Sequence, residues 1–305
     1  MRLLDADEVR GSLSYTDAIE ALERAFRGAD PSATPLRTSV ATEAGTLLLM
    51  PATSPEASGV KLVTLTPANP AAGRPLIHAV YVVFDGLTQA PVAVLDGAAL
   101  TALRTSAVSS MATRHLATED ASRLVVFGSG VQATAHVDAI RAVRPIERVT
   151  VVGRDAAKAD ALAARIRRDG LEALVGDARS VSDADVVCTC TTATTPLFDG
   201  AWLRPGCHVN AVGAFRPEDR EVDTETIARA RVVVETRDVA AAEAGDLLIP
   251  IAEGAIGWDH VVADLAEVVA GASVRRSPDD VTLFESVGVA FEDLAVASAI
   301  VGRGG

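Results

Sequence analysis

The chain has 305 residues, enough for about two domains of ordinary size, and its 49% hydrophobic and 23% charged residues are typical of a globular α/β protein. A net charge of −13 with no basic block argues against a nucleic-acid partner. No apolar run approaches the roughly 20 residues that span a bilayer, and Met1–Val9 has no signal-peptide core, so we expect a cytoplasmic protein with no membrane partner.

The first 118 residues are predicted to form an α+β domain. An amphipathic helix at Tyr15–Arg27 comes first, with Leu22 and Phe26 on its apolar side. Strand-like segments punctuated by prolines then predict a largely antiparallel sheet. These segments are Arg37–Thr42, Gly45–Met50, Val60–Thr66, Ile77–Phe84 and Pro91–Leu95. A helix rich in alanine, serine and threonine, Leu100–Leu116, leads into the next domain.

Residues 119–280 are predicted to form a Rossmann dinucleotide-binding domain. Leu124–Phe127 is predicted to be a buried strand, and the G-x-G-x-x-A motif Gly128-Ser129-Gly130-Val131-Gln132-Ala133 follows it, before a helix at Ala135–Ala142. Glycine backbone in such a turn can approach a pyrophosphate, which rests on the helix N-terminus. A second apolar strand, Val149–Val152, supplies the expected context. A strand-to-helix turn without a ligand is the alternative.

The residues after this second strand bear on the type of dinucleotide. An NAD site usually carries an acid there for the ribose hydroxyl, whereas arginine suits a 2′-phosphate. Here Gly153 is followed by Arg154, then by Asp155, with Lys158 one helical turn beyond. The pattern favours NADPH, with NADH possible. In the alternative, Asp155 faces the ribose and Arg154 lies in a solvated loop.

Beyond Arg154, predicted strands and helices alternate as βαβ units require. The helices are Ala156–Arg168, Val181–Ala184, Thr224–Arg229 and Val261–Ala270, and the strands are Ala173–Val175, Asp185–Thr191, His208–Val212 and Val232–Glu235. Gly271 is the expected end of the helix before it. Ser286–Val301 is predicted to be a final helix, and residues 281–305 are expected to complete the first domain.

No metal is predicted. Cys188, Cys190 and Cys207 lack zinc spacing and are expected to be buried free thiols in a reducing compartment. The histidines outside the first domain's strands also lack metal-ligand spacing; they are His115, His136, His208 and His260.

Three cations in the first domain are candidates for chemistry. Arg37 precedes a strand, Lys61 lies inside an apolar one, and Arg104 lies near the start of the long helix. Charged side chains are rarely buried unless they are paired or bind a ligand. If these three converge, they suit a substrate carboxylate. Salt bridges or an edge-strand lysine are the alternative.

The chain resembles the ornithine cyclodeaminase/mu-crystallin family over nearly its whole length. Matching residues occur in the family's order and at compatible spacing. They are Arg37, Leu49-Met50-Pro51, Gly59-Val60-Lys61, Asn69, Leu100-Thr101-Ala102-Leu103-Arg104-Thr105, Gly128–Ala133, Asn210-Ala211-Val212-Gly213 and Leu283-Phe284-Glu285-Ser286-Val287-Gly288.

The resemblance implies an α/β chain: a Rossmann dinucleotide-binding domain plus an α+β substrate and dimerisation domain completed by the C-terminal helix. It also implies a homodimer whose site holds a small imino, amino or keto acid by its carboxylate, through Arg37, Lys61 and Arg104. Further residues are implied to contact the cofactor: His78 and Thr105, and, on its nicotinamide side, Cys190, Thr191, Thr192, Val212 and Ser286. For several of them a plain packing role is the alternative.

Two positions depart from the cyclodeaminase pattern. Cyclodeaminases carry a glutamate before Leu-Met-Pro, where this chain has Leu48, and an aspartate after Asn-Ala-Val-Gly, where it has Phe215. Oxidising ornithine requires carboxylates that bind the δ-ammonium group and move protons, which leucine and phenylalanine cannot do. Leu48, Phe215 and Val287 are instead expected to line the substrate pocket.

Residues 213–221 are similar to the G-A-x-R-P-x-x-R-E stretch of mu-crystallin-type ketimine reductases. The resemblance therefore implies NAD(P)H-dependent reduction of a cyclic ketimine such as Δ1-pyrroline-2-carboxylate or Δ1-piperideine-2-carboxylate. Three alternatives stay open: an ornithine cyclodeaminase, an alanine or other amino-acid dehydrogenase, and a ligand-binding protein without turnover, like mu-crystallin.

Overall fold

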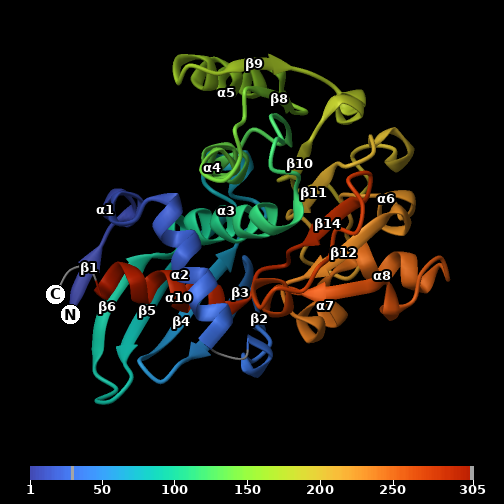
Figure 1. Cartoon of the computed structure of the whole chain (residues 1–305). Coiled ribbons are helices and arrows are strands. Elements are labelled where there is room, and N and C mark those ends of the chain that lie inside the picture. Colours follow the sequence, from blue (N-terminus) through green and yellow to red (C-terminus); the bar gives the residue numbers. More distant parts are fainter. Residues whose placement is uncertain (29–30, 303–305) are drawn as a thin grey trace. The chain divides into compact units, whose positions relative to one another are not determined.

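The computed structural model describes residues 1–28 and 31–302 (Figure 1). Its contacts divide the chain into two compact units: Met1–Thr105 together with the chain from Val289 onward, and Ser106–Gly288. Within the described residues, each unit is built on one sheet, of six and eight strands. The α/β fold class expected from the sequence is confirmed. In the described part of the chain, no helix combines the length and apolar character that crossing a membrane requires.

The first unit contains a mixed sheet in the order β1-β6-β5-β4-β3-β2. Short β1 pairs parallel with β6, and the other neighbours are antiparallel, as the sequence predicted. The strands are β1 (Arg2–Leu4), β2 (Thr38–Thr42), β3 (Gly45–Thr53), β4 (Ala57–Leu65), β5 (Ile77–Asp85) and β6 (Pro91–Asp96). Alternate residues of β3 and β4 are buried, which is the two-residue period of a sheet with one covered face.

Helices of the first unit cover that buried face. They are α1 (Ala6–Ser12), α2 (Tyr15–Gly28) and the C-terminal α10 (Ala290–Gly302). The red helix α10 packs on α2 and on β3 and β4, from the other end of the chain (Figure 1). Phe26 of α2 meets Phe291 of α10 edge to face, with ring centroids 5.3 Å apart. The C-terminal helix thus completes the core of the first unit.

The second unit contains a parallel sheet in the order β13-β12-β14-β11-β10-β7-β8-β9. Its strands are β7 (Arg123–Phe127), β8 (Arg148–Val152), β9 (Glu172–Val175), β10 (Val186–Thr189), β11 (His208–Ala211), β12 (Ala230–Val234), β13 (Val261–Asp264) and β14 (Val281–Glu285). The order reverses between β7 and β10, so the carboxyl ends of these two strands flank the switch point where such sheets bind ligands.

Helices and short 3₁₀ turns connect the strands of this unit. The helices are α3 (Gly97–Leu116, which begins in the first unit), α4 (Val131–Arg141), α5 (Ala156–Arg168), α6 (Thr224–Arg229), α7 (Arg237–Glu243), α8 (Gly245–Ala252) and α9 (Leu265–Val269). The 3₁₀ turns among the described residues are η1 (Pro31–Ala33), η2 (Pro70–Ala72), η3 (Ala178–Asp183), η4 (Gly200–Trp202) and η5 (Trp258–His260).

Two predicted segments are corrected by the structure. Val261–Ala270 is strand β13 followed by α9, because Asp264 caps the helix and so divides the segment. The predicted final helix begins only at Ala290, since Gly288 adopts a left-handed φ of 82° before it.

The predicted domain boundary also moves. Residues 281–285 form β14, which pairs with β11 and β12 and therefore belongs to the second unit. The chain returns to the first unit only at Val289, and the earlier boundary falls at 105/106, inside α3, instead of at 118/119. Residues 303–305 of the segment expected to complete the first domain lie outside the described residues.

Two arginines satisfy the C-terminal carbonyls of α3. The buried Arg144 guanidinium donates to the carbonyl oxygens of Thr113, Arg114 and Ala117 at 2.8–2.9 Å. Arg275 donates from Nε to the carbonyl oxygen of Leu116 at 2.9 Å. A helix end leaves such carbonyls without partners, and burying them unpaired is costly.

We expect Arg144→Met to lower the free energy of unfolding by about 3 kcal/mol, because it leaves several buried carbonyls without a donor. The measurement is urea denaturation followed by circular dichroism. Arg168→Met, at an exposed arginine of α5, is the control and should change stability by less than about 0.5 kcal/mol. Equal midpoints for the two variants would contradict this account of the helix end.

Candidate active site

The glycine turn after β7 has the backbone that the sequence motif predicts. Gly128 has φ +109°, and a Cβ there would lie 2.5 Å from the carbonyl oxygen of Cys190. Its N–H donates to the carbonyl of Val152 at 2.8 Å, which ties the ends of β7 and β8 together. Only glycine tolerates both the left-handed φ and the close approach. The turn lies at the switch point of the parallel sheet.

The N-terminus of α4 is open to an anion. Gly130 is its N-cap, and among the described residues no side chain caps the first turn and no atom would lie within 4 Å of a Cβ on Gly130. Val131, the first helical residue, is 70% exposed, whereas Ser129 and Gln132 are half-buried. Unpaired N–H groups beside an open glycine suit a phosphate. These residues therefore fit the pyrophosphate of a dinucleotide.

The residues after β8 divide their roles. The Asp155 carboxylate caps α5, accepting from the Lys158 backbone N–H at 3.1 Å, and the Lys158 ammonium lies 3.7 Å from it. Arg154 is exposed. Gly153 packs close to α5, since a Cβ there would lie 3.2 Å from that of Ala159. The acid at this position is thus already engaged, while the arginine faces solvent.

The predicted nicotinamide-side residues follow the ends of adjacent parallel strands. Each of three backbone N–H groups donates to the carbonyl oxygen of the last residue of the neighbouring strand. Cys190 donates to Phe127 of β7 (2.9 Å), Val212 to Thr189 of β10 (3.2 Å) and Ser286 to Ala211 of β11 (2.9 Å). The ladder between strands therefore continues one residue past β10, β11 and β14. The structure brings these three residues to one edge of the sheet, although their contact with a cofactor stays a prediction.

Other predicted residues of this unit lie near the same strand ends. Thr191 is half-buried and Thr192 exposed, directly after Cys190. Phe215 is half-buried, with the Arg216 guanidinium 5.5 Å from its ring centroid, and Val287 is buried. All three cysteines are free, and burial raises the pKa of the Cys188 and Cys207 thiols to about 12, so these two are not reactive nucleophiles.

Buried carboxylates at this edge were not predicted as site residues. Glu221 accepts from the backbone N–H groups of Thr191 (2.8 Å) and Gly213 (2.7 Å), and so joins the segments after β10 and β11. Glu235 accepts from the Ser286 hydroxyl at 2.7 Å and from the backbone after it. Glu221 ends the reductase-like stretch at 213–221, a signal that could have found it. Glu235 carries no such signal.

In the first unit, Lys61 is the centre of a buried ionic group. Its Nζ lies 2.8 Å from Oδ2 of Asp293 and 3.3 Å from Oγ1 of Thr101. Lys61 is 2% exposed and Asp293 is fully buried. Arg104 lies 2.7 Å from Glu292 (Nη1 to Oε2) and 3.2 Å from Asp293 (Nε to Oδ1). Asp293 therefore fixes the lysine and the arginine side by side.

The environment of Lys61 lowers its pKa to about 8. Burial is the main cause, because it penalises the charged form, and the positive charges of Arg104 and Arg37 act in the same direction. The carboxylate of Asp293 partly opposes them through its charge and hydrogen bond. Arg37, half-buried before β2, is thus within electrostatic range of Lys61. The structure brings the three predicted cations together, although their roles stay predictions.

The register of the sheet places the remaining predicted residues of this unit. Leu48 lies on the same covered face as Lys61, because it pairs with Val63, two residues along β4. His78 is exposed on the opposite face, so the structure does not bring it to Lys61 within one chain. Thr105 is buried in α3, next to Arg104.

Tyr81 was not predicted from the sequence. It pairs with Lys61 across β4 and β5 and is fully buried, and its hydroxyl has no hydrogen-bond partner among the described residues. Burial and the charge of Asp293 raise its pKa well above the usual value. A Cβ on Gly59 would lie 2.3 Å from this hydroxyl, so glycine at 59 makes room for the tyrosine. Tyr81 thus adds a neutral hydroxyl beside the ionic group.

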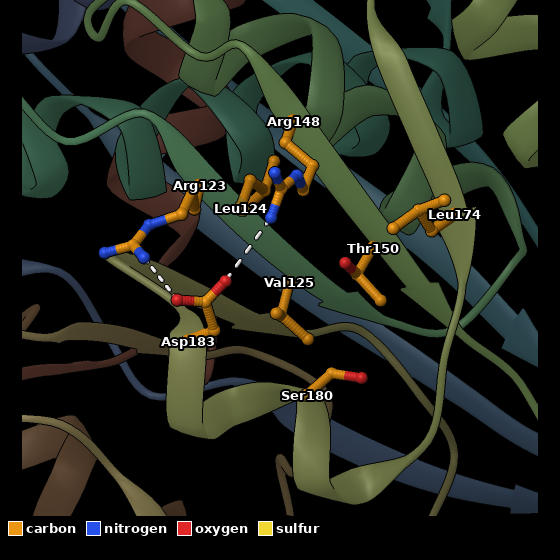
Figure 2. Close-up of a pocket in the computed structure, with 8 residues that line it drawn as sticks. All are labelled: Arg123, Leu124, Val125, Arg148, Thr150, Leu174, Ser180 and Asp183. Atoms are coloured by element: carbon orange, nitrogen blue, oxygen red, sulfur yellow. Dashed lines mark hydrogen bonds and ion pairs between the residues drawn. The ribbon is translucent and has the colours of Figure 1, made fainter.

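A small pocket lies at the opposite, amino ends of the parallel strands. In Figure 2, Arg123 and Arg148 approach Asp183 from the starts of β7 and β8, while Thr150 and Ser180 line the wall. Ligands of such sheets bind at the carboxyl ends, so we assign this pocket a structural role. Among the described residues, no group of three or more histidine, cysteine or acidic side chains is arranged to hold a metal ion.

The parallel sheet, its switch point and the glycine turn define a Rossmann-like α/β protein. The chain belongs to the ornithine cyclodeaminase/mu-crystallin family, whose model matches residues 1–303.

Relatives with assigned activities cover nearly the whole chain. A Δ1-pyrroline-2-carboxylate reductase of Bacillus cereus is 38% identical over 314 residues, covering 99% of this chain and 96% of the relative. The structure of Thermococcus litoralis Δ1-pyrroline-2-carboxylate reductase in complex with NADH and L-proline is similar with a TM-score of 0.93 and 35% identity, covering 99% and 97% of the chains. An archaeal alanine dehydrogenase dimer with bound NAD has the same TM-score at 31% identity, covering 99% and 95%.

We expect Gly130→Ala to leave folding intact, because the added Cβ contacts no other atom of the described residues. The Kd of NADPH and NADH should rise at least about tenfold, because the methyl group occupies the space that the pyrophosphate must approach. Binding is measured by the fluorescence of the reduced nicotinamide, and folding by thermal melting. Gly11→Ala, which also adds a methyl group in open space, is the control. Unchanged affinity in Gly130→Ala would remove this turn from the binding site.

Proposed function

We propose that the protein is an NAD(P)H-dependent reductase of cyclic ketimine carboxylates, converting Δ1-pyrroline-2-carboxylate or Δ1-piperideine-2-carboxylate to the cyclic amino acid. The observation that carries this proposal is the buried Lys61, with a pKa of about 8, beside Arg104 and Arg37 and on the same sheet face as Leu48. The full-length similarity to pyrroline-2-carboxylate reductases supports the same activity.

The charge of the ionic group suits an anionic substrate. Lys61, Arg37 and Arg104 are cations, and the two carboxylates beside them, Asp293 and Glu292, leave one positive charge when all five are ionised. An arginine can bind a carboxylate through several donors, and Arg104 forms ion pairs with two acids, Glu292 and Asp293. We assign the substrate carboxylate to Arg37 and Arg104.

Lys61 is assigned the proton chemistry of the reduction. A bound NADPH or NADH supplies the hydride that adds to the imine carbon. The C=N bond then becomes CH–NH, so one proton must reach or stay on the nitrogen, and protonation of that nitrogen makes the carbon electrophilic. A lysine with a pKa near neutrality is suited to hold and donate this proton. The Asp293 carboxylate keeps the Lys61 ammonium in place.

Leu48 supports reduction over cyclodeamination. It presents an apolar side chain on the Lys61 face, at the position where the cyclodeaminase pattern has a glutamate for the δ-ammonium group of ornithine. We assign Leu48, Phe215 and Val287 to the walls of the substrate pocket. Alanine dehydrogenase remains the second candidate, because the archaeal enzyme is equally similar in fold.

We propose NADPH as the preferred cofactor. Exposed Arg154 is available for a 2′-phosphate, while Asp155 is engaged at the start of α5. The contacts assigned to the dinucleotide are the glycine turn from Gly128 to Gln132 and the residues that follow the strand ends. The latter are Gly153, Arg154, Asp155, Lys158, Cys190, Thr191, Thr192, Val212 and Ser286, with His78 and Thr105 from the first unit.

We propose a homodimer that forms through the first unit. The face of its sheet opposite α2 and α10 carries apolar side chains of neighbouring strands, including Leu47, Leu62 and Val82. On the same face Val40 and Val80 are 45% and 43% exposed. An apolar sheet face of this kind favours association. The dimeric state of the archaeal alanine dehydrogenase supports the proposal.

The function is tested by reduced-cofactor absorbance with the two cyclic imines, comparing NADPH and NADH. We expect NADPH consumption with at least one imine, and Arg154→Ala should lose at least about tenfold in kcat/KM with NADPH but little with NADH, because the lost contact is to the 2′-phosphate. Ammonia release from L-ornithine with oxidised cofactor would identify a cyclodeaminase instead. Turnover of pyruvate with ammonia would identify an alanine dehydrogenase, and cofactor binding without any turnover a binding protein.

The pH dependence tests Lys61. Because the protonated lysine is the active form, kcat/KM should fall above about pH 8, and Lys61→Met should lose about 10²–10⁴-fold at pH 7. Asp293→Asn removes a charge and a hydrogen bond that raise the Lys61 pKa, so the alkaline fall should begin at lower pH. Asp7→Asn, at an exposed carboxylate of α1, is the control. A profile unchanged in Asp293→Asn would exclude Lys61 as the titrating group.

A further inference from the structure

Four carboxylates are buried together at the carboxyl edge of the parallel sheet and have no role in the proposed chemistry. They are Glu221, Glu235, Asp246 and Glu285, all at most 2% exposed. Acidic side chains are almost never fully buried unless they are paired. We call these four residues the acid cluster. Its members come from the ends of β12 and β14, from the segment after β11 and from the start of α8.

Glu221 and Asp246 act in sequence on the segments that follow β10 and β11. Asp246 accepts from the backbone N–H groups of Glu221 and Val222, both at 2.8 Å, and so fixes the backbone of Glu221. The Glu221 side chain in turn holds Thr191 through its N–H and hydroxyl, and Gly213 through its N–H. A Cβ on Gly213 would lie 2.4 Å from the Glu221 carboxylate, so this contact requires glycine.

Glu235 holds the segment that follows β14 through hydrogen bonds to its side chain. Its two oxygens accept from the Ser286 hydroxyl and from the N–H groups of Val287 and Gly288, at 2.7–3.1 Å. Together, Glu221 and Glu235 fix three adjacent segments of the sheet edge. Ser286 and Thr191 in these segments are two of the residues assigned to the nicotinamide half of the cofactor.

Glu285 differs from the other three. It is the last residue of β14, and among the described residues neither of its carboxyl oxygens has a hydrogen-bond partner. The charges that act on it are all those of acids: Asp246 from α8, Glu235 from the end of β12 and Glu221 from the segment after β11. Arg220 acts on Asp246 as a cation at the margin of the cluster. A charged Glu285 would therefore repel every other member.

We propose that the acid cluster positions the residues that bind the nicotinamide half of the dinucleotide, and that Glu285 makes this binding depend on pH. The proposal rests on the proposed function insofar as that function requires a dinucleotide at this edge. Glu221 and Glu235 are positioning residues, because they act through Thr191, Gly213 and Ser286. These three residues lie in the segments that follow β10, β11 and β14.

The direction of the pH dependence follows from the burial of the cluster. Burial raises the pKa of Asp246 to about 7, and burial with the charges of its three neighbours raises the pKa of Glu285 well above its usual value. Asp246 therefore holds its proton at pH 6 and loses it as the pH rises past 7, and Glu285 keeps its proton to a higher pH than an ordinary glutamate. Each added charge repels Glu221 and Glu235, whose hydrogen bonds order the edge. Both cofactor affinity and stability should fall with rising pH, since the folded state binds more protons than the unfolded chain.

The test measures the Kd of NADPH by nicotinamide fluorescence between pH 6 and pH 9. In the wild type we expect the Kd to rise at least about tenfold over this range, because one linked proton can change affinity by up to tenfold per pH unit. Glu285→Gln, which keeps the shape and cannot ionise, should show less than about a threefold rise. Glu218→Gln makes the same change at an exposed glutamate and should follow the wild type. Each variant meets the same cofactor, so the titration of the cofactor itself cancels.

Two further measurements keep the outcome unambiguous. Asp246→Asn retains an oxygen acceptor while removing the charge, so it should also flatten the dependence of Kd on pH. This variant serves as the test if Glu285→Gln does not fold. The melting temperature without cofactor should fall between pH 5 and pH 8 in the wild type and fall less in either variant. Parallel Kd profiles for wild type and both variants would overturn the proposal. Absence of NADPH and NADH binding at every pH, with the melting pattern as expected, would instead overturn the proposed function.

Discussion

The ion pair between Lys61 and Asp293 is the contact on which the first unit depends. The two residues lie 232 positions apart in the chain, and both are buried. Removing either partner of such a pair leaves a charge without compensation in the interior, at a cost of about 3–5 kcal/mol. The pair joins α10 to β4, and the same carboxylate orients Arg104. One aspartate therefore closes the fold and places the two cations assigned to the substrate.

The second unit depends on the way its parallel strands end. Backbone groups at strand ends lose their neighbours, and here Cys190, Val212 and Ser286 extend the ladder by one residue. Buried carboxylates then hold the residues beyond. The result is an ordered edge beside the glycine turn, built from segments that have no regular structure of their own. Rigid segments of this kind can hold reacting atoms at a defined distance.

Charge is distributed very differently at the two sites of an acidic chain. The net charge of −13 belongs mostly to the surface and suits no particular ligand. Around Lys61 three cations, counting half-buried Arg37, outnumber the two acids Asp293 and Glu292, whereas the acid cluster gathers carboxylates with Arg220 only at its margin. Because burial removes the screening of water, the few buried charges influence chemistry more than the many exposed ones.

The sequence by itself determined what local pattern can encode. The glycine turn, the alternating strands β3 to β5, the parallel βα order and the three cations follow from residue types at short spacing. Only the tertiary structure decided which carboxylates meet them. The residues next to Asp293 and Glu235 in the sequence do not indicate which groups these two carboxylates bind. A short apolar run such as β14 has the same hydrophobic pattern as a segment of a buried helix. Partners come from distant positions, and burial depends on every layer packed around them, so neither can be inferred before the chain is folded.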